Sequence, residues 1–443
     1  MPKIRAGVPY DPSDRDSLME YARKLDGSTL GEWIFDQGSL ITGGKGDFGR
    51  ILESEVFYIE NNSDPVPDFE ILGIDLKATP LKRKKRGGET PKERLVLSTI
   101  NYMDIIKDGW DKFFSKNGKL LIVFYLYEEG KDVFSYRIMK AMLWEYSDED
   151  LLVIRDDWDK IADMVKAGRA HELSEGQTMY LGAARKGMGH GANMRPQPYS
   201  TELASQRAFS LKQSYIGQIW NRMKDADSLI DLSKFDESRT FEEDVLSRFD
   251  EFKGLYTEEI RNKVGPELQT ASKSYFASLA RRMMGIRTQK IMEFEKAGVM
   301  MKTIRLQPNG VPKEDMSFPY FEYAQLISTT WEDSEFFECL NRRFLFIIYQ
   351  MDKKGVYFKD VMFWSMPLND QKKSEDVWSK TLKLVKKGEY DGLPKSSENP
   401  VSHVRPHGRN RDDTTPGLDG SPQTKKCFWL NRRYIAEQLT KTQ

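Results

Sequence analysis

The chain has 443 residues, with 68 basic and 68 acidic side chains and a formal net charge of zero at neutral pH. This length exceeds one ordinary hydrophobic core and predicts two or three domains, while the charge balance excludes a globally cationic nucleic-acid binder, so any polyanion must meet local basic patches. The two cysteines, Cys339 and Cys427, exclude a disulfide framework, and no signal peptide or apolar run of roughly 20 residues is present, which predicts a soluble cytoplasmic protein.

Helical and strand patterns alternate along the first half of the chain. Residues 47–60 carry apolar side chains at helical spacing and predict a helix. Residues 70–78, 118–127 and 133–144 are rich in β-branched and aromatic side chains and predict three strands. We therefore expect an α/β domain in which helices flank a central mixed sheet.

The polar stretch 221–243 lacks apolar periodicity and indicates a linker. It would separate a domain of residues 1–220 from one of residues 244–443. The second half also repeats the first at an offset of about 220 residues, which predicts a tandem duplication. The aligned pairs keep their order: 73-GIDLKATPL-81 with 298-GVMMKTIRL-306, 120-LLIVFY-125 with 344-FLFIIY-349, 190-HGAN-193 with 407-HGRN-410, and 208-AFSLKQSYI-216 with 427-CFWLNRRYI-435.

The predicted strand in 67-PDFEILGIDLKATP-80 carries charges that a buried strand does not need for packing. Side chains two apart share a face, so Asp75 and Lys77 point the same way, and Asp68 supplies a second carboxylate nearby in sequence. Two converging carboxylates can hold Mg²⁺, and a lysine beside the ion can orient or deprotonate water and offset charge on a phosphorane. This pattern favours phosphodiester hydrolysis. The alternative is a structural Asp–Lys pair at a strand edge, since acid-x-Lys spacing recurs elsewhere in the chain.

A family resemblance adds to this reading. The segment 45-KGDFGRILE-53, the proline-preceded Asp68, the run 73-GIDLKATP-80 and 207-RAFSLK-212 together resemble the MutH-like nucleases that act at GATC in DNA, and in particular the two-domain Sau-type type II restriction endonucleases. The resemblance implies a restriction-endonuclease-like PD-(D/E)xK fold. It also implies a Mg²⁺ cofactor and double-stranded DNA as the partner.

The same resemblance implies a role for each site residue. Asp68 and Asp75 would be metal ligands, Lys77 the catalytic lysine and Glu53 an additional acid, with Glu55 as the fallback for Glu53. Two positions depart from the family: Asp75 stands where glutamate is frequent, and Ser210 replaces an aromatic side chain.

The candidate DNA contacts lie in loops and near glycines. Lys45 follows a glycine pair, Arg185 and Lys186 precede a glycine-rich loop, and Lys212 ends the segment 207-RAFSLK-212. The basic run 82-KRKKR-86 is either a phosphate contact or a solvated loop. A zinc site at His190 is not expected, because no histidine has ligand spacing with a cysteine.

The second half predicts a nuclease fold without nuclease chemistry. Met300 stands opposite Asp75, Lys302 remains opposite Lys77, Glu293 lies opposite Asp68, and 276-FASLARR-282 contains no acid. We expect this half to bind a second DNA site, with dimerisation or DNA looping as consequences. The leading hypothesis is a type II restriction endonuclease. The alternatives are a strand-nicking mismatch-repair-type endonuclease and a non-catalytic sequence-specific DNA-binding protein.

Overall fold

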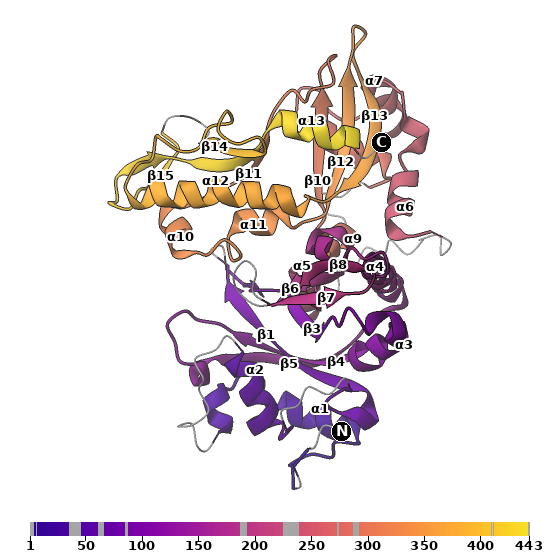
Figure 1. Cartoon of the computed structure of the whole chain (residues 1–443), viewed down its shortest axis with the longest axis vertical. Helices are drawn as coiled ribbons and strands as arrows, with labels where there is room; N and C mark the ends of the chain where they lie inside the picture. Colours follow the sequence, from indigo (N-terminus) through magenta and orange to yellow (C-terminus); the bar gives the residue numbers. More distant parts are fainter. Residues whose placement is uncertain are drawn as a thin grey trace. The chain divides into compact units, whose positions relative to one another are not determined.

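The computed structural model describes residues 4–5, 7–34, 46–60, 66–84, 87–186, 193–224, 239–272, 274–286, 292–408, 410 and 412–441. The chain divides into two compact units, drawn in Figure 1. The first unit comprises residues 1–174, 178–234 and 292–298, and the second comprises residues 175–177, 235–291 and 299–443. A single boundary at 221–243 does not describe this division, because residues 292–298 pack with the first half.

The main sheet of the first unit has the strand order β2-β1-β4-β5. Strands β1 and β4 are parallel and the other pairs are antiparallel, which gives the mixed α/β arrangement expected from the sequence. The apolar run of β4 is buried almost throughout, as its central position requires. These strands are β1 (Ile74–Arg83), β2 (Glu89–Pro91), β4 (Lys119–Leu126) and β5 (Arg137–Glu145).

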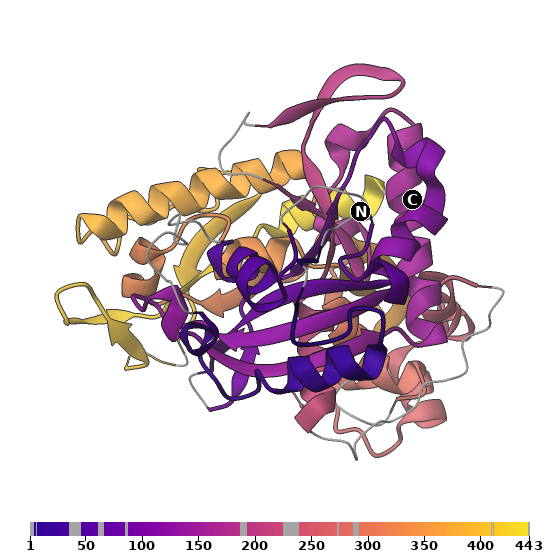
Figure 2. The same ribbon diagram turned by 90° about the horizontal axis from the view of Figure 1, so that it is seen from below.

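A smaller antiparallel sheet, β3-β9-β6, and a separate hairpin, β7–β8, complete the strands of this unit. Helix α1 packs against β5, as Figure 2 shows from below, and α3 packs against β1. The strands are β3 (Leu95–Thr99), β6 (Leu181–Arg185), β7 (Met194–Gln197), β8 (Ser200–Ser205) and β9 (Arg207–Leu211). The helices are α1 (Arg15–Arg23), α2 (Asp47–Ile51), α3 (Ile105–Asn117), α4 (Asp148–Lys166), α5 (Gln213–Lys224) and α9 (Met292–Ala297).

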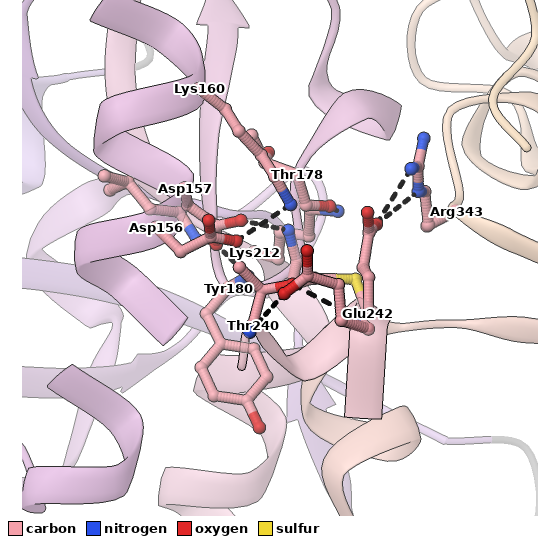
Figure 3. Close-up of polar contacts among 12 residues, drawn as sticks. Asp156, Asp157, Lys160, Thr178, Tyr180, Lys212, Thr240, Glu242 and Arg343 are labelled. Atoms are coloured by element: carbon pink, nitrogen blue, oxygen red, sulfur yellow. Dashed lines mark hydrogen bonds and ion pairs between the residues drawn. The ribbon is translucent and has the colours of Figure 1, made fainter. Parts of the chain in front are cut away.

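A buried carboxylate joins helix α4 to strand β6. The Asp157 carboxylate accepts backbone N–H groups of Met179, Tyr180 and Leu181 at 2.7, 2.6 and 2.9 Å (Figure 3). Three donors that would otherwise lack partners are thereby satisfied inside the protein. The contact fixes where β6 begins, and β6 ends at Arg185, a candidate DNA contact.

Three predicted elements have different ends from those expected. The helix expected over 47–60 is realised as α2 followed by a π-helical turn, Leu52–Val56, which is an uncommon form found often at functional sites. The strands expected from 70 and 133 begin later, because Glu70–Leu72 and Val133–Ser135 form 3₁₀ turns. The first turn ends at Gly73, whose φ of 65° is the left-handed conformation that glycine favours.

The second unit contains two sheets, β10-β12-β13 and β11-β17-β14, and a hairpin, β15–β16. Its strands are β10 (Met300–Leu306), β11 (Met316–Tyr320), β12 (Phe344–Met351), β13 (Val356–Trp364), β14 (Ser402–Pro406), β15 (Thr414–Pro416), β16 (Pro422–Thr424) and β17 (Lys426–Leu430). Its helices are α6 (Phe241–Ser247), α7 (Thr257–Val264), α8 (Tyr275–Met283), α10 (Tyr323–Ser328), α11 (Glu335–Leu340), α12 (Leu368–Lys386) and α13 (Arg432–Lys441).

Strands β10 and β12 of the second unit pair in the same way as strands β1 and β4 of the first unit. Both pairs are parallel, and Lys302 lies opposite Phe346 as Lys77 lies opposite Ile122. The buried side chains of the second unit form a core of their own, which includes Phe344, Phe346 and Trp364. No helix within the described part of the chain is long and apolar enough to cross a membrane.

Candidate active site

The site begins at the start of strand β1. Asp75 is 1% exposed, and its Oδ2 lies 2.5 Å from Nζ of Lys77, so the two charged side chains share one face as the strand pattern predicts. Apart from this ion pair, no donor in the described residues satisfies either oxygen of the Asp75 carboxylate. Ile74 and Leu76 point into the hydrophobic core. A buried carboxylate with so few partners is costly for folding alone, and it is the kind of group that a cation would satisfy.

Asp68 is held against the same strand by the backbone. Its Oδ2 accepts the N–H of Leu76 at 2.9 Å. Burial and the neighbouring Asp75 charge raise the pKa of Asp68 to about 7, although Lys77 and the backbone hydrogen bond oppose the shift. The negative charges of Asp68 and Asp75 therefore repel each other, which makes it unfavourable for both carboxyl groups to be ionised.

Glu53 lies on the π-helical turn and joins the cluster. Burial raises its pKa; Lys77 opposes this shift and Asp75 adds to it. The fallback candidate Glu55 instead lies 3.6 Å from Arg5, and 28% of its side chain is exposed to solvent. The structure thus brings Glu53, and not Glu55, into electrostatic contact with the charged strand.

Lys77 remains an ammonium in this environment. Burial alone would lower its pKa, but Asp75, Asp68 and Glu53 together raise it above the usual value. The four side chains predicted from the sequence therefore form one mutually interacting cluster. Their proximity is a finding, while their catalytic roles belong to the proposal below.

The sequence analysis did not predict one charged residue near this cluster, Lys116. Lys116, near the end of α3, lowers the pKa of Glu53 through its positive charge. No motif connects Lys116 with β1. Only the packing of α3 against that strand brings the lysine near the cluster.

The residues predicted to contact DNA differ from one another in exposure and in their hydrogen-bond partners. Lys186 is exposed, and its Nζ donates to Oγ1 of Thr99 at 2.8 Å, while Arg185 is partly buried at the end of β6. The Lys212 ammonium donates to the carbonyl oxygen of Thr178 inside the protein. The role of Lys212 as a DNA contact stays a prediction.

Some predicted features fall outside the described residues. These are Lys45, His190 and the last two residues of the basic run 82–86, whereas the first three residues of that run are exposed.

The corresponding strand of the second unit has a different chemistry. Lys302 Nζ donates to the carbonyl oxygen of Ser317 at 3.1 Å, and burial lowers the pKa of Lys302. The positive charge of Arg342 lowers the pKa of Lys302 further, while Cys339 and Cys427 oppose the shift. Met300 offers a thioether where Asp75 offers oxygens, and helix α8 contains no acid.

The residues of the first cluster suit Mg²⁺. Carboxylate oxygens are the ligands that this hard cation prefers, and it commonly binds through one or two of them while keeping several waters. Within the described ranges, no three or more His, Cys, Asp or Glu side chains form a complete metal cage. Asp75 and Asp68 are thus the two groups that would hold the ion, and Glu53 is near enough for its charge to raise the pKa of Asp68.

Comparisons with known proteins identify similar sequences among DNA repair and restriction enzymes. The sequence model of the family described as DNA mismatch repair enzyme MutH matches residues 57–157 and again residues 284–376. The type II restriction enzyme Sau3AI of Staphylococcus aureus is 32% identical, over 91% of this chain and 91% of the relative. The DNA mismatch repair protein MutH of Shewanella woodyi is 27% identical over 48% of this chain and 94% of its own length, and that of Yersinia enterocolitica is 26% identical over 48% and 95%.

Proposed function

Because the chain belongs to the family of MutH-like nucleases that includes the type II restriction enzyme Sau3AI, we propose that it is a Mg²⁺-dependent type II restriction endonuclease that hydrolyses double-stranded DNA at GATC. The observation that carries the proposal is the buried Asp75 carboxylate, which is paired with Lys77 and has no other hydrogen-bond partner among the residues that the structure describes. Such a group is retained for chemistry more readily than for stability.

Each residue of the cluster has a defined task in this proposal. Asp75 and Asp68 would hold Mg²⁺, which would supply a Lewis acid to polarise the phosphate. Lys77 keeps its proton at Nζ, so its ammonium orients the attacking water and offsets the negative charge that develops on the phosphorane. Glu53, with a raised pKa, stands ready to exchange a proton at its carboxylate.

We further infer that the second unit is a duplicated copy without catalysis. Two observations support this: the family match to residues 284–376 as well as 57–157, and the common register of β1–β4 and β10–β12. A methionine at position 300 cannot replace a carboxylate as a Mg²⁺ ligand. The copy would bind a second GATC and control cleavage by the first unit.

Two other functions have less support. A strand-nicking repair enzyme would match the mismatch-repair relatives, but these align with only about half of this chain, whereas the restriction enzyme aligns with nearly all of it. A DNA-binding protein without catalysis would have no need of the buried cluster around Asp75 and Lys77.

The test is hydrolysis of matched duplexes that differ only in one GATC. With Mg²⁺, the purified protein should cut both strands of the GATC duplex and leave the altered duplex intact, and a chelator should stop the reaction. Cutting of one strand alone would favour the nicking enzyme. Specific binding without any cutting would favour the non-catalytic protein.

A further inference from the structure

A buried ion pair joins a segment from the second half of the sequence to the first unit. Lys296 Nζ lies 2.6 Å from Oδ1 of Asp150, and the two side chains are 8% and 2% exposed. Lys296 belongs to α9, which packs against α5 within the first unit (Figure 1). Removing two charges from water is costly unless each is well paired, so the pair imposes one docked position on α9.

Further contacts fix the same segment. The Tyr215 hydroxyl donates to Oδ2 of Asp150 at 2.8 Å, and Ser214 Oγ donates to the carbonyl oxygen of Lys296 at 2.8 Å. Gly298 follows with a φ of +63°, and a Cβ there would lie 2.9 Å from Ser214 Oγ. The close approach at position 298 therefore requires glycine. The segment is held by the Lys296 side chain, by the Lys296 carbonyl oxygen and by the packing of Gly298 against Ser214.

A continuous set of contacts leads from this pair to the catalytic strand. Asp75 lies opposite Leu120, which in turn lies opposite Trp144, so Asp75 and Trp144 stand in one cross-strand row. The Trp144 ring meets the Tyr215 ring edge-on, with centroids 6.3 Å apart. Tyr215 then donates to Asp150. The first two steps are neighbouring positions in the sheet, and the last two are side-chain contacts, so a shift of Tyr215 would be transmitted to the strand through buried, closely packed residues.

From these contacts we propose that Lys296 is a positioning residue for cleavage, supplied to the catalytic unit by the second half of the chain. The inference rests on the proposed role of Asp75 in cleavage. Lys296 neutralises Asp150 and so holds Tyr215 and Trp144 beside the catalytic strand. The first half of the sequence alone therefore lacks one component of its own catalytic unit.

A double-mutant cycle in the full-length protein tests the pair. Lys296→Met keeps the aliphatic stem but leaves Asp150 with a buried unpaired charge. Asp150→Asn in the same chain removes that charge while keeping an acceptor for the Tyr215 hydroxyl. We expect Lys296→Met to lower kcat about tenfold or more with KM within twofold, and the double variant to recover most of the loss.

Thermal unfolding supplies a readout independent of activity. Lys296→Met should lower the melting temperature of the first unit by roughly 10 °C, and the double variant should recover most of that shift. Activity is measured at a temperature at which near-ultraviolet circular dichroism shows every variant to be folded. A purely structural pair would change the melting temperature and leave kcat unaltered, which would overturn the proposal.

The two proposals fail in different ways. If the wild-type protein cleaves no duplex, the nuclease function is wrong, while the coupling between Asp150 and Lys296 in unfolding is still measurable. If the wild type cleaves and Lys296→Met has an unchanged kcat, only the positioning role is wrong.

Discussion

Binding of a divalent cation at the cluster should release a proton, and the amount should depend on pH in a defined way. Burial and Asp75 raise the pKa of Asp68 to about 7 in the metal-free protein. A carboxyl with that pKa is about 0.9 protonated at pH 6 and about 0.1 protonated at pH 8. Since a cation binds the carboxylate and not the acid, Ca²⁺ binding should release close to one proton at pH 6 and almost none at pH 8.

The same linkage fixes the sign of two further effects. Below pH 7 the apparent affinity for Ca²⁺ should weaken, approaching tenfold per pH unit. Because the folded-state pKa of Asp68, about 7, lies above its value of 3.8 in an unfolded chain, the contribution of Asp68 to metal-free stability should be fully present below about pH 4 and be lost as the pH rises from about 4 to 7. If Asp68 acted alone, the loss would be on the order of 4 kcal/mol.

Calorimetry in two buffers of different ionisation heat measures the proton release directly. Ca²⁺ is suitable because it takes oxygen ligands but should not support efficient cutting. Glu55→Gln is the matched control, since that carboxylate faces Arg5, and its proton release should equal that of the wild type. Asp68→Asn should abolish most of the release at pH 6. A Ca²⁺ affinity that is constant between pH 6 and pH 8 would refute this description of the site.

Three other outcomes follow from the structure. Asp75→Asn should reduce Mg²⁺-dependent cleavage at least 10³-fold while gel-shift binding to GATC DNA in Ca²⁺ persists, since Asp75 acts on metal and water and not on bases; loss of binding would give Asp75 another role. Asp157→Ala leaves three backbone donors unpaired and should lower the free energy of unfolding of the first unit, measured in urea, by about 3 kcal/mol. Asp156→Ala removes an ion pair with Lys160 and should lower it by less than about 1 kcal/mol. Equal effects of the two variants would contradict the structural role of Asp157. DNA with two GATC sites should be cut faster than DNA with one in a gel assay, because a second unit that binds a second site shifts the active state; equal rates would remove the regulatory role.

The charged strand shows which part of the candidate site could be predicted from the sequence pattern. The alternation of 74-IDLK-77 was enough to place Asp75 and Lys77 on one face, because strand geometry is local and periodic. The approach of Asp68 was predictable from its motif but not from periodicity, since a 3₁₀ turn and Gly73 bring it back onto Leu76.

Other features depend on contacts that no local pattern specifies. Lys116 reaches the cluster only because α3 packs against β1, and the inward turn of Lys212 depends on the carbonyl of Thr178. The sequence repeat placed residues 292–298 in the second half, yet a buried Asp150–Lys296 pair assigns them to the first unit. Long-range pairings of this kind are invisible to composition and spacing.

The most direct test of the central claim compares two lysines at matching positions. Lys77→Met and Lys302→Met make the same substitution at register-matched positions of β1 and β10. If the first unit alone carries the chemistry, Lys77→Met should lose at least 10³-fold in single-turnover cleavage of a one-site duplex, and Lys302→Met should retain the wild-type rate within a few-fold. Wild-type cleavage by Lys77→Met, or an equal loss in both variants, would contradict the account.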